Sequence, residues 1–462
     1  MKKLKIVVIG AGSANFGTGI ITDLVSSKEL QEFDLEILLV DIDEKALDNM
    51  LKLGNLIKLY YKSKVKISAT KDRTEALPGA NYVIVSVAKN RWELWEKDFY
   101  IPASFGFKHV FGENGGPGGA FHTLRSLNLM VPIAKDIEKY CPDALLLNFS
   151  NPESRVCYGI SKLTKIKAVG LCHGPIETLN VIGKILKKPV EEIEITVGGL
   201  NHFHWALKII DKKTGKDLYP DIDKNIDSFD WQADKLTPAL YKLFGLITYP
   251  APSHPGEYLN FAASIAGPHF VYWGIGRVSH GLFSKSTDLD YVIEWENNRP
   301  SYELWSIDQA KRVENAISGK IPLTDKEPMM NSSFIDPTFE IAIPIICDIE
   351  LNLNRKEIAA NLVNEGFAVS NLPDDAIVEV PIQVNSSGVK PVKVGPLPEA
   401  IRGLCEIQIS IQRLLIEAYE KKSKRILLQA LMIDPIVDDL VRAKEMMETM
   451  LKIEKEFLPE IL

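Results

Sequence analysis

The sequence predicts an α/β protein in which an N-terminal doubly wound parallel sheet precedes a C-terminal α+β domain. Three observations indicate this fold class: a glycine turn between the first strand and helix, strands that alternate with helices up to about residue 170, and a second part that ends in a hairpin and long helices. Alternating strands and helices are typical of a parallel sheet that binds ligands at the carboxyl ends of its strands. We therefore expect two domains, residues 1–170 and 171–462.

The composition argues against a protein that binds nucleic acid or spans a membrane. The chain has 462 residues, of which 46% are hydrophobic, enough for a large core. A net charge of −7 gives no basic surface for nucleic acid. The 5 cysteines form no CxxC pair, and no apolar run approaches the roughly 20 residues of a membrane span. We expect a cytoplasmic protein with no nucleic-acid or membrane partner.

The segment LKIVVIGAGSANF has the pattern of a strand, a tight turn and a helix. Gly10 and Gly12 allow a pyrophosphate to approach the backbone, and the helix N-terminus favours its charge. Asn15 stands where the third glycine of this fingerprint is usual. Asp41 ends the second strand, LEILLVDID, and is a candidate for the ribose hydroxyls, although it lies beyond the usual spacing of about 20 residues. The pattern predicts a nucleotide site.

Three polar segments follow predicted strands, at 88–93, 148–154 and 171–175. The last contains Cys172, where a strand leaves the sheet for the expected cleft. The segment FGENGGPGGAFHTLRS (111–126) lies between the third and fourth strands of the predicted sheet and is rich in glycine. We interpret it as a loop over the cofactor; the alternative is a flexible surface turn.

The segment GGLNHFHW places two histidines on a predicted strand, where His202 and His204 would share one face. A single histidine there could belong to the core, but two beside Asn201 favour a site. Cys172 and His202 have the donor types of a divalent transition-metal site with open positions for substrate oxygens. A Cys172–His173 nucleophilic pair is less favoured, because adjacent side chains on an extended chain point apart.

Taken together, these motifs resemble glycoside hydrolase family 4, the NAD- and metal-dependent glycosidases. The resemblance runs through GAGSANF, DIDE, GENGGPGGAFHTLRS, the NP of FSNPES, CHGP, GGLNHF, NLVNEGFAVSNLPDDAIVEVP and ALMIDP. It implies a Rossmann-type domain like that of lactate and malate dehydrogenases. It also implies NAD and Mn²⁺, or another divalent metal, as cofactors, a sugar substrate, and a homodimer or homotetramer.

The resemblance assigns roles to individual residues. Cys172 and His202 would bind the metal. NAD contacts are implied at Gly10, Gly12, Ser13, Asn15, Phe16, Asp41 and Asn90, and substrate contacts at Asn151, Arg91, Glu113, Arg125 and His254. His173 would assist the leaving group.

The catalytic base of the family is usually a tyrosine or aspartate in the loop that corresponds to residues 243–261. Here Pro252 falls where the aspartate is expected. The remaining candidates are Tyr249, His254, Glu257 and Tyr258. We favour Tyr249 as the base, with Tyr258 as a further catalytic residue.

In the family, NAD⁺ oxidises C3 of the sugar, the metal assists removal of the C2 proton, the leaving group is eliminated, water adds, and C3 is reduced again. We favour an α-galacturonide or other α-hexuronide as the substrate, because the GPGG…LR segment with CHG resembles family members that act on α-hexuronides. Arg91 could pair with the uronate carboxylate in bidentate fashion; the alternative is a solvent-facing loop arginine. The alternative is an NAD-dependent 2-hydroxy-acid dehydrogenase of the lactate/malate type, which shares the fold but leaves Cys172 without a role.

Overall fold

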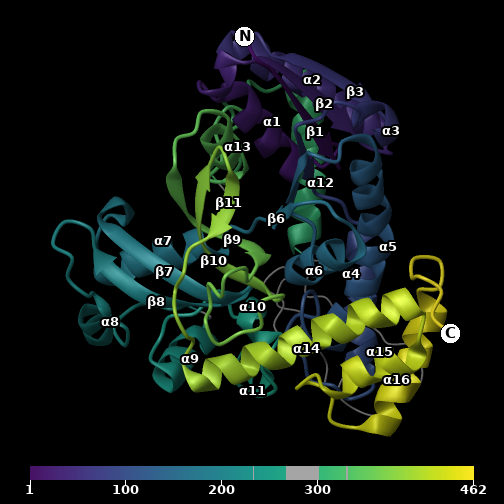
Figure 1. The fold of residues 1–462 in the computed structure, drawn as a ribbon, viewed down its shortest axis with the longest axis vertical. Helices are drawn as coiled ribbons and strands as arrows, with labels where there is room; N and C mark the ends of the chain where they lie inside the picture. Colours follow the sequence, from purple (N-terminus) through teal and green to yellow (C-terminus); the bar gives the residue numbers. More distant parts are fainter. Residues whose placement is uncertain (233, 267–300, 329–330) are drawn as a thin grey trace.

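The computed structural model describes residues 1–232, 234–266, 301–328 and 331–462. Its centre is a nine-stranded sheet of order β11-β10-β9-β6-β5-β4-β1-β2-β3 (Figure 1). Six strands are parallel: β1 (Lys3–Ile9), β2 (Asp34–Val40), β3 (Lys66–Thr70), β4 (Tyr82–Val85), β5 (Leu145–Asn148) and β6 (Ala168–Gly170). The expected parallel sheet and fold class are confirmed.

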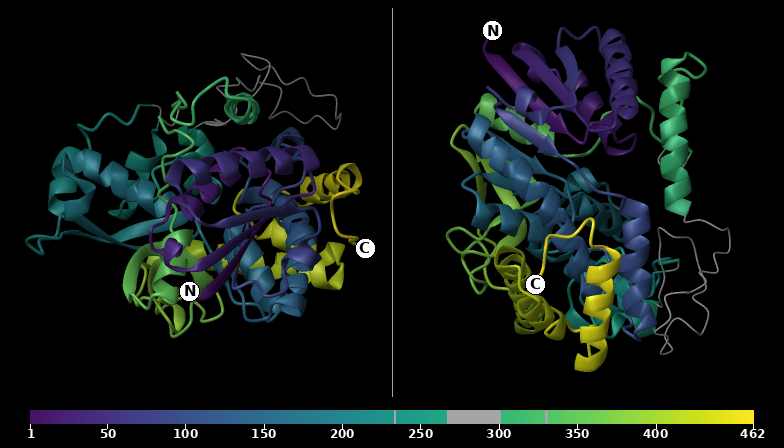
Figure 2. Two further views of the ribbon diagram at one scale, coloured as in Figure 1. Left: turned by 90° about the horizontal axis from the view of Figure 1, so that it is seen from above. Right: turned by 90° about the vertical axis from the view of Figure 1, so that its right-hand side faces the viewer.

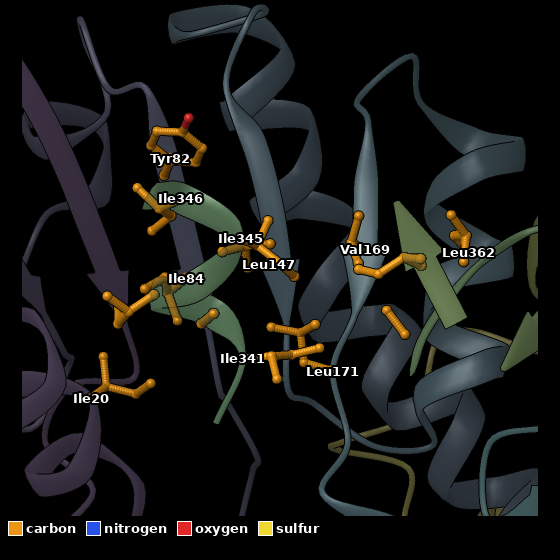
Figure 3. Close-up of a cluster of buried hydrophobic side chains, with 14 of the residues drawn as sticks. Ile20, Tyr82, Ile84, Leu147, Val169, Leu171, Ile341, Ile345, Ile346 and Leu362 are labelled. Carbon is orange, nitrogen blue, oxygen red and sulfur yellow. The ribbon is translucent and has the colours of Figure 1, made fainter. Parts of the chain in front are cut away.

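Helices cover both faces of the parallel strands, because consecutive strand side chains point to opposite faces. Ile6 and Ile84 face one core, whereas Val7 and Val83 face the other. The first face is covered by α1 (Phe16–Ser26), α2 (Glu44–Tyr61) and α13 (Ala342–Glu350), and the second by α3 (Arg73–Ala76), α5 (Gly116–Tyr140) and α6 (Glu153–Leu163). Figure 3 shows α13 lying against the first face.

Strands from the second half of the chain complete the same sheet. β9 (Arg355–Val363) runs antiparallel to β6, where Asn361 pairs with Gly170. β10 (Ile377–Asn385) and β11 (Gly388–Pro391) form the hairpin predicted in the second part of the chain. The boundary predicted at residues 170 and 171 therefore falls directly after β6, and the two parts of the chain share one sheet.

Two further groups of elements pack beside the sheet (Figures 1 and 2). The hairpin of β7 (Ile193–Leu200) and β8 (Phe203–Asp211) shares a small core with α7 (Gly174–Leu186), α8 (Tyr219–Asn225) and α9 (Leu236–Phe244). Helices α14 (Glu399–Lys421), α15 (Lys424–Met432) and α16 (Leu440–Ile453) share a core with α5 and α6. The remaining elements are α4 (Arg91–Ser104), α10 (Ser253–Gly256), α11 (Ala262–Ala266), α12 (Ser301–Ile317), η1 (Leu30–Glu32) and η2 (Val190–Glu192). None of the described helices combines the length and apolar character needed to cross a membrane.

The glycine-rich segment is not the loop that we expected over the cofactor. Helix α5 begins at Gly116, and its first turn is buried. A Cβ at Gly118 would lie 2.4 Å from the carbonyl oxygen of Asp98, and a Cβ at Gly119 would lie 2.6 Å from the carbonyl carbon of Asn114. The glycines are therefore explained by close packing of the helix start against its neighbours, and the prediction of a loop through residue 126 is wrong.

The side chain of Asp434 is buried at the start of α5. From its position we predict that the stability of the protein depends on pH. Burial raises the pKa of Asp434 to about 6, against the opposing influence of the Ile436 N–H, Arg155 and the Gly116 N–H. Because the pKa in the folded state exceeds the unfolded value of about 4, stability is lost as the pH rises from about 4 to 6 and stays lower above that range. Replacing Asp434 by asparagine should remove this loss.

We expect the stability of Asp434→Asn relative to wild type to increase by up to about 3 kcal/mol between pH 4 and pH 7.5. Urea unfolding at both pH values measures the difference. A difference that does not change with pH would contradict the prediction, because a merely structural effect of the amide has no reason to follow this titration.

Candidate active site

The turn between β1 and α1 has the geometry expected of a dinucleotide site. Gly10 has a φ of +87°, and a Cβ there would lie 1.9 Å from the carbonyl oxygen of Ser86. The backbone N–H of Gly12 donates to Oδ2 of Asp41 at 2.8 Å. Gly17 takes the place of the missing third glycine, since a Cβ there would lie 2.3 Å from the carbonyl oxygen of Ala11. The sequence pattern missed Gly17 because it follows Gly12 by more residues than the usual motif allows.

The other residues predicted to contact NAD lie at or near this turn. The Oγ of Ser13 accepts the N–H of Phe16 at 3.2 Å, and the Phe16 ring lies 4.7 Å from that of Phe149. The Nδ2 of Asn15 donates to Oγ of Ser306 on α12 at 2.8 Å. Asn90 follows β4 and precedes α4 with a φ of +41°.

His202 lies at the tip of the β7–β8 hairpin and not within a strand. Leu200 pairs with Phe203, so Asn201 and His202 form the turn, and His202 has a φ of +60°. The prediction that His202 and His204 share a strand face is therefore wrong. Burial lowers the pKa of His202 well below its ordinary value, so the imidazole is neutral, as a metal ligand requires.

Cys172 lies beside this turn. It follows β6, and its sulfur accepts the N–H of Gly174 at 3.4 Å and a hydrogen bond from the side chain of Asn201. Burial, together with the negative charges of Glu379 and Glu153, raises the pKa of the Cys172 thiol. A dication would counteract both effects and favour the thiolate. The structure thus brings the two predicted metal ligands to adjacent positions through Asn201.

A buried acidic network lies behind Cys172, and most of it was not predicted. Oε2 of Glu379 lies 2.5 Å from Nδ1 of His204, and Oε1 accepts the amide of Asn361 at 3.0 Å. Asn201 donates to Oε2 of Glu153 at 3.3 Å and to Oε1 of Glu379 at 3.4 Å. His204 is therefore part of this network. The detectable signal was Glu379 itself, a charged residue inside the apolar strand AIVEVPIQV.

Asn114 contacts both His202 and Asn151, which the sequence predicts separately as a metal ligand and a substrate contact. Its Nδ2 lies 2.6 Å from Nδ1 of His202 and 3.4 Å from Oδ1 of Asn151. The backbone of Asn151 is fixed by Ser126, whose hydroxyl donates to the Asn151 carbonyl oxygen at 2.7 Å. Among the described residues, no group of three or more His, Cys, Asp or Glu side chains is arranged to bind a metal ion. A metal ion here would therefore be held by Cys172 and His202, and its open positions would be left for substrate oxygens.

The loop that follows α9 places aromatic rings against His202. The ring of His254 lies 4.2 Å from that of His202, and the ring of Tyr249 lies 4.7 Å from that of His254. Tyr249 is fully buried, and a Cβ at Gly174, near Cys172, would lie 3.0 Å from Cε1 of its ring. Burial lowers the pKa of His254 to about 3, so it is neutral. The rings of Tyr249 and His254 thus lie together beside His202.

Glu257 and Tyr258 have other surroundings. Both carboxylate oxygens of Glu257 accept backbone N–H groups of the segment 113–115, at 2.8, 2.7 and 2.7 Å. This arrangement anchors the segment and leaves Glu257 poorly placed to act as a base. The hydroxyl of Tyr258 lies 3.5 Å from the carbonyl oxygen of Asn201, and burial together with the charge of Glu257 raises its pKa well above the ordinary value.

Arg91 lies at a cavity near the end of β4. The cavity is lined by Ala88, Lys89, Arg91, Trp95, Glu113, His122, Arg125, Ser126 and Leu129. An amino group of Arg91 donates to Oε1 of Glu113 at 2.7 Å, and its guanidinium lies 5.2 Å from the Trp95 ring. Because Glu113 already pairs with Arg91, Lys89 supplies additional positive charge at the cavity, which favours an anionic group.

Arg125 forms ion pairs with two buried carboxylates. Its guanidinium donates to Oδ1 of Asp98 at 2.9 Å, and also to Oδ2 of Asp98 and to Glu454. Both acids are fully buried. The structure thus assigns Arg125 to an ion-pair cluster that joins α4, α5 and the segment after α16.

His173 lies at the start of α7, and its side chain is 55% exposed. Its Nε2 lies 3.4 Å from Glu177, and its Nδ1 lies 3.8 Å from Glu340. The side chain therefore faces these two acids and solvent, beside the position of Cys172.

Two family models match the chain: the family 4 glycosyl hydrolase model at residues 5–188 and the C-terminal domain of the same family at 197–437. The chain is 29% identical to an α-glucosidase of Erwinia rhapontici, covering 98% of both, and 27% identical to an α-galacturonidase of Thermoanaerobacter italicus, covering 98% of this chain and 97% of the relative. A 6-phospho-α-glucosidase from gut microorganisms, solved with NAD and Mn²⁺, has the same fold, with a TM-score of 0.79, 23% identity and full coverage of both chains.

This chain belongs to family 4 of the glycosyl hydrolases. The predicted family and the predicted class of enzyme, a glycoside hydrolase, are confirmed. The alternative of a 2-hydroxy-acid dehydrogenase is wrong, although such enzymes share the N-terminal fold.

Proposed function

We propose that this glycosidase cleaves the α-glycosidic bond of hexuronides, with α-galacturonides favoured, and that it uses NAD and a divalent metal ion such as Mn²⁺. The observation that carries the proposal is the junction of Cys172 with the His202 turn through Asn201, at the carboxyl end of the parallel strands. The relative named as an α-galacturonidase and the related structure solved with NAD and Mn²⁺ support it.

The residues around Gly10 fit NAD. A turn without side chains before a helix N-terminus suits a pyrophosphate, and Asp41 beside Gly12 suits the ribose hydroxyls. The residues around Cys172 fit a divalent metal, because a thiol, a neutral imidazole and an excess of buried negative charge favour a dication. When bound, these groups would accept hydride from the sugar and acidify its adjacent C–H.

Tyr249 is proposed as the base at C2 of the sugar. Its ring packs between the imidazoles of His202 and His254 and the start of α7, which excludes water and fixes its direction. Asn151 would hold the ring hydroxyls, and His173 would assist the leaving group from the solvent side. Arg91, beside Lys89, would receive the uronate carboxylate.

The test is hydrolysis of the p-nitrophenyl α-galacturonide, α-glucuronide, α-galactoside and α-glucoside, each with and without NAD⁺, Mn²⁺ and a reductant. We expect nitrophenol release from the uronides that requires both NAD⁺ and metal and produces no net NADH. Hydrolysis of only the neutral glycosides would contradict the substrate, and hydrolysis that is independent of NAD⁺ would contradict the mechanism.

A further inference from the structure

We propose that Asn114, held in place by Glu257, is a positioning residue that fixes the orientation and the tautomer of the His202 imidazole for metal binding. This inference rests on the proposed function, because it needs a metal at His202.

The anchor of the arrangement is the Glu257 carboxylate. It is fully buried, and its Oε1 accepts the N–H of Glu113 while Oε2 accepts those of Asn114 and Gly115. Three bonds to consecutive amides fix the backbone of this segment directly before α5. The segment also packs closely against Glu257, since a Cβ at Gly115 would lie 2.6 Å from the carbonyl oxygen of Glu257.

The fixed backbone directs the Asn114 side chain at His202. The Asn114 amide lies 2.6 Å from Nδ1, so His202 can present only Nε2 to a metal. A metal-bound imidazole carries its proton on the other nitrogen and donates it to an oxygen acceptor. The Oδ1 of Asn114 is buried without a hydrogen-bond partner. A half-turn of the amide gives this oxygen to Nδ1–H, and amide orientation is assigned from such networks.

Asn151 is the third member of the contact. Its side-chain amide lies 3.4 Å from that of Asn114, so the Asn114 amide touches both the predicted metal ligand and the predicted sugar contact. When the Asn114 amide is turned, a half-turn of the Asn151 amide keeps this hydrogen bond. Movement of the segment 113–115 would therefore disturb both at once. This placement distinguishes a positioning role from one confined to folding.

The experiment compares Mn²⁺ binding, followed by the EPR signal of free Mn²⁺, in wild type, Asn114→Leu and Asn114→Asp, all with saturating NAD⁺. Leucine has about the size of asparagine but lacks its hydrogen-bond acceptor. We therefore expect the Kd for Mn²⁺ to rise about 10- to 100-fold in Asn114→Leu. Aspartate keeps an acceptor and should bind within about fivefold of wild type or more tightly. The Kd for NAD⁺ should change less than about twofold in both, because the glycine turn is untouched.

A further variant, Glu257→Gln, should also weaken Mn²⁺ binding, and the double variant with Asn114→Leu should be no weaker than Asn114→Leu alone, because both act through one contact. Mn²⁺ affinity in Asn114→Leu equal to wild type would overturn the inference. Absence of Mn²⁺ binding to the wild-type protein would instead overturn the metal site of the proposed function.

Discussion

Replacing Cys172 by serine is expected to lower the rate of glycoside hydrolysis at least about a thousandfold. The thiolate is the softer of the two predicted metal ligands, and a metal that polarises substrate oxygens contributes several kcal/mol to lowering the barrier. Each 1.4 kcal/mol corresponds to about a tenfold change in rate. The hydroxyl of serine fills the same space but remains protonated beside Glu153 and Glu379, so it cannot replace the ligand.

Two measurements separate this effect from damage to the fold. The thermal midpoint of the metal-free serine variant should stay close to wild type, because the buried thiol gains little from its acidic neighbours. Cys141→Ser is the matched control, since Cys141 is buried at the end of α5, before β5 and thus at the opposite end of the parallel strands from Cys172, and the variant should keep its activity. Retention of hydrolysis and of Mn²⁺ affinity in Cys172→Ser would remove Cys172 from the proposed metal site.

Replacing Arg125 by methionine is expected to destabilise the protein by about 3–5 kcal/mol at pH 7. The change leaves Asp98 and Glu454 buried without a counter-charge, and breaking a buried ion pair on one side costs about this much. Burial, opposed by Arg125, already raises the pKa of Asp98 well above its ordinary value. Without Arg125 the acids ionise less readily still, so the destabilisation should become smaller as the pH falls.

Urea unfolding at pH 7 and pH 5 measures both effects. Arg73→Met is the matched control: Arg73 pairs with Asp136 at a partly exposed site, where loss of the pair should cost less than about 1 kcal/mol. Adding Asp98→Asn and Glu454→Gln to Arg125→Met should recover part of the stability. Unchanged stability with a raised KM would instead support the substrate contact predicted for Arg125 from the sequence.

Much of the fold could be predicted because the apolar pattern has a simple physical cause. Strands buried on both faces read as continuous apolar runs, such as KIVVI and ILLV, and the helices between them have a clear amphipathic period. The start of α5 was missed because four glycines in five residues suggest a loop. Close approach of α5 to Asp98 and Glu257 explains them, and such contacts are invisible in a local pattern.

The candidate site was predicted in its parts but not in its connections. Cys172 and His202 carry recognisable donor types, whereas Asn114 acquires its importance only from lying 2.6 Å from His202. His202 was placed on a strand because alternation continues through GGLNHFHW, and only the pairing of Leu200 with Phe203 reveals a turn there. Glu257 was counted among the possible bases because its sequence context does not show three amides facing its carboxylate.

The shared sheet has a consequence for how the protein is made. Strand β6 is an edge until β9 is made and its Asn361 pairs with Gly170, so a nascent chain on the ribosome carries an open, hydrogen-bonding edge while the residues between the two strands are synthesised. Contacts between such distant segments slow folding, because a long chain must close before they form. A product cut short before β9 would keep that edge exposed and would be prone to self-association.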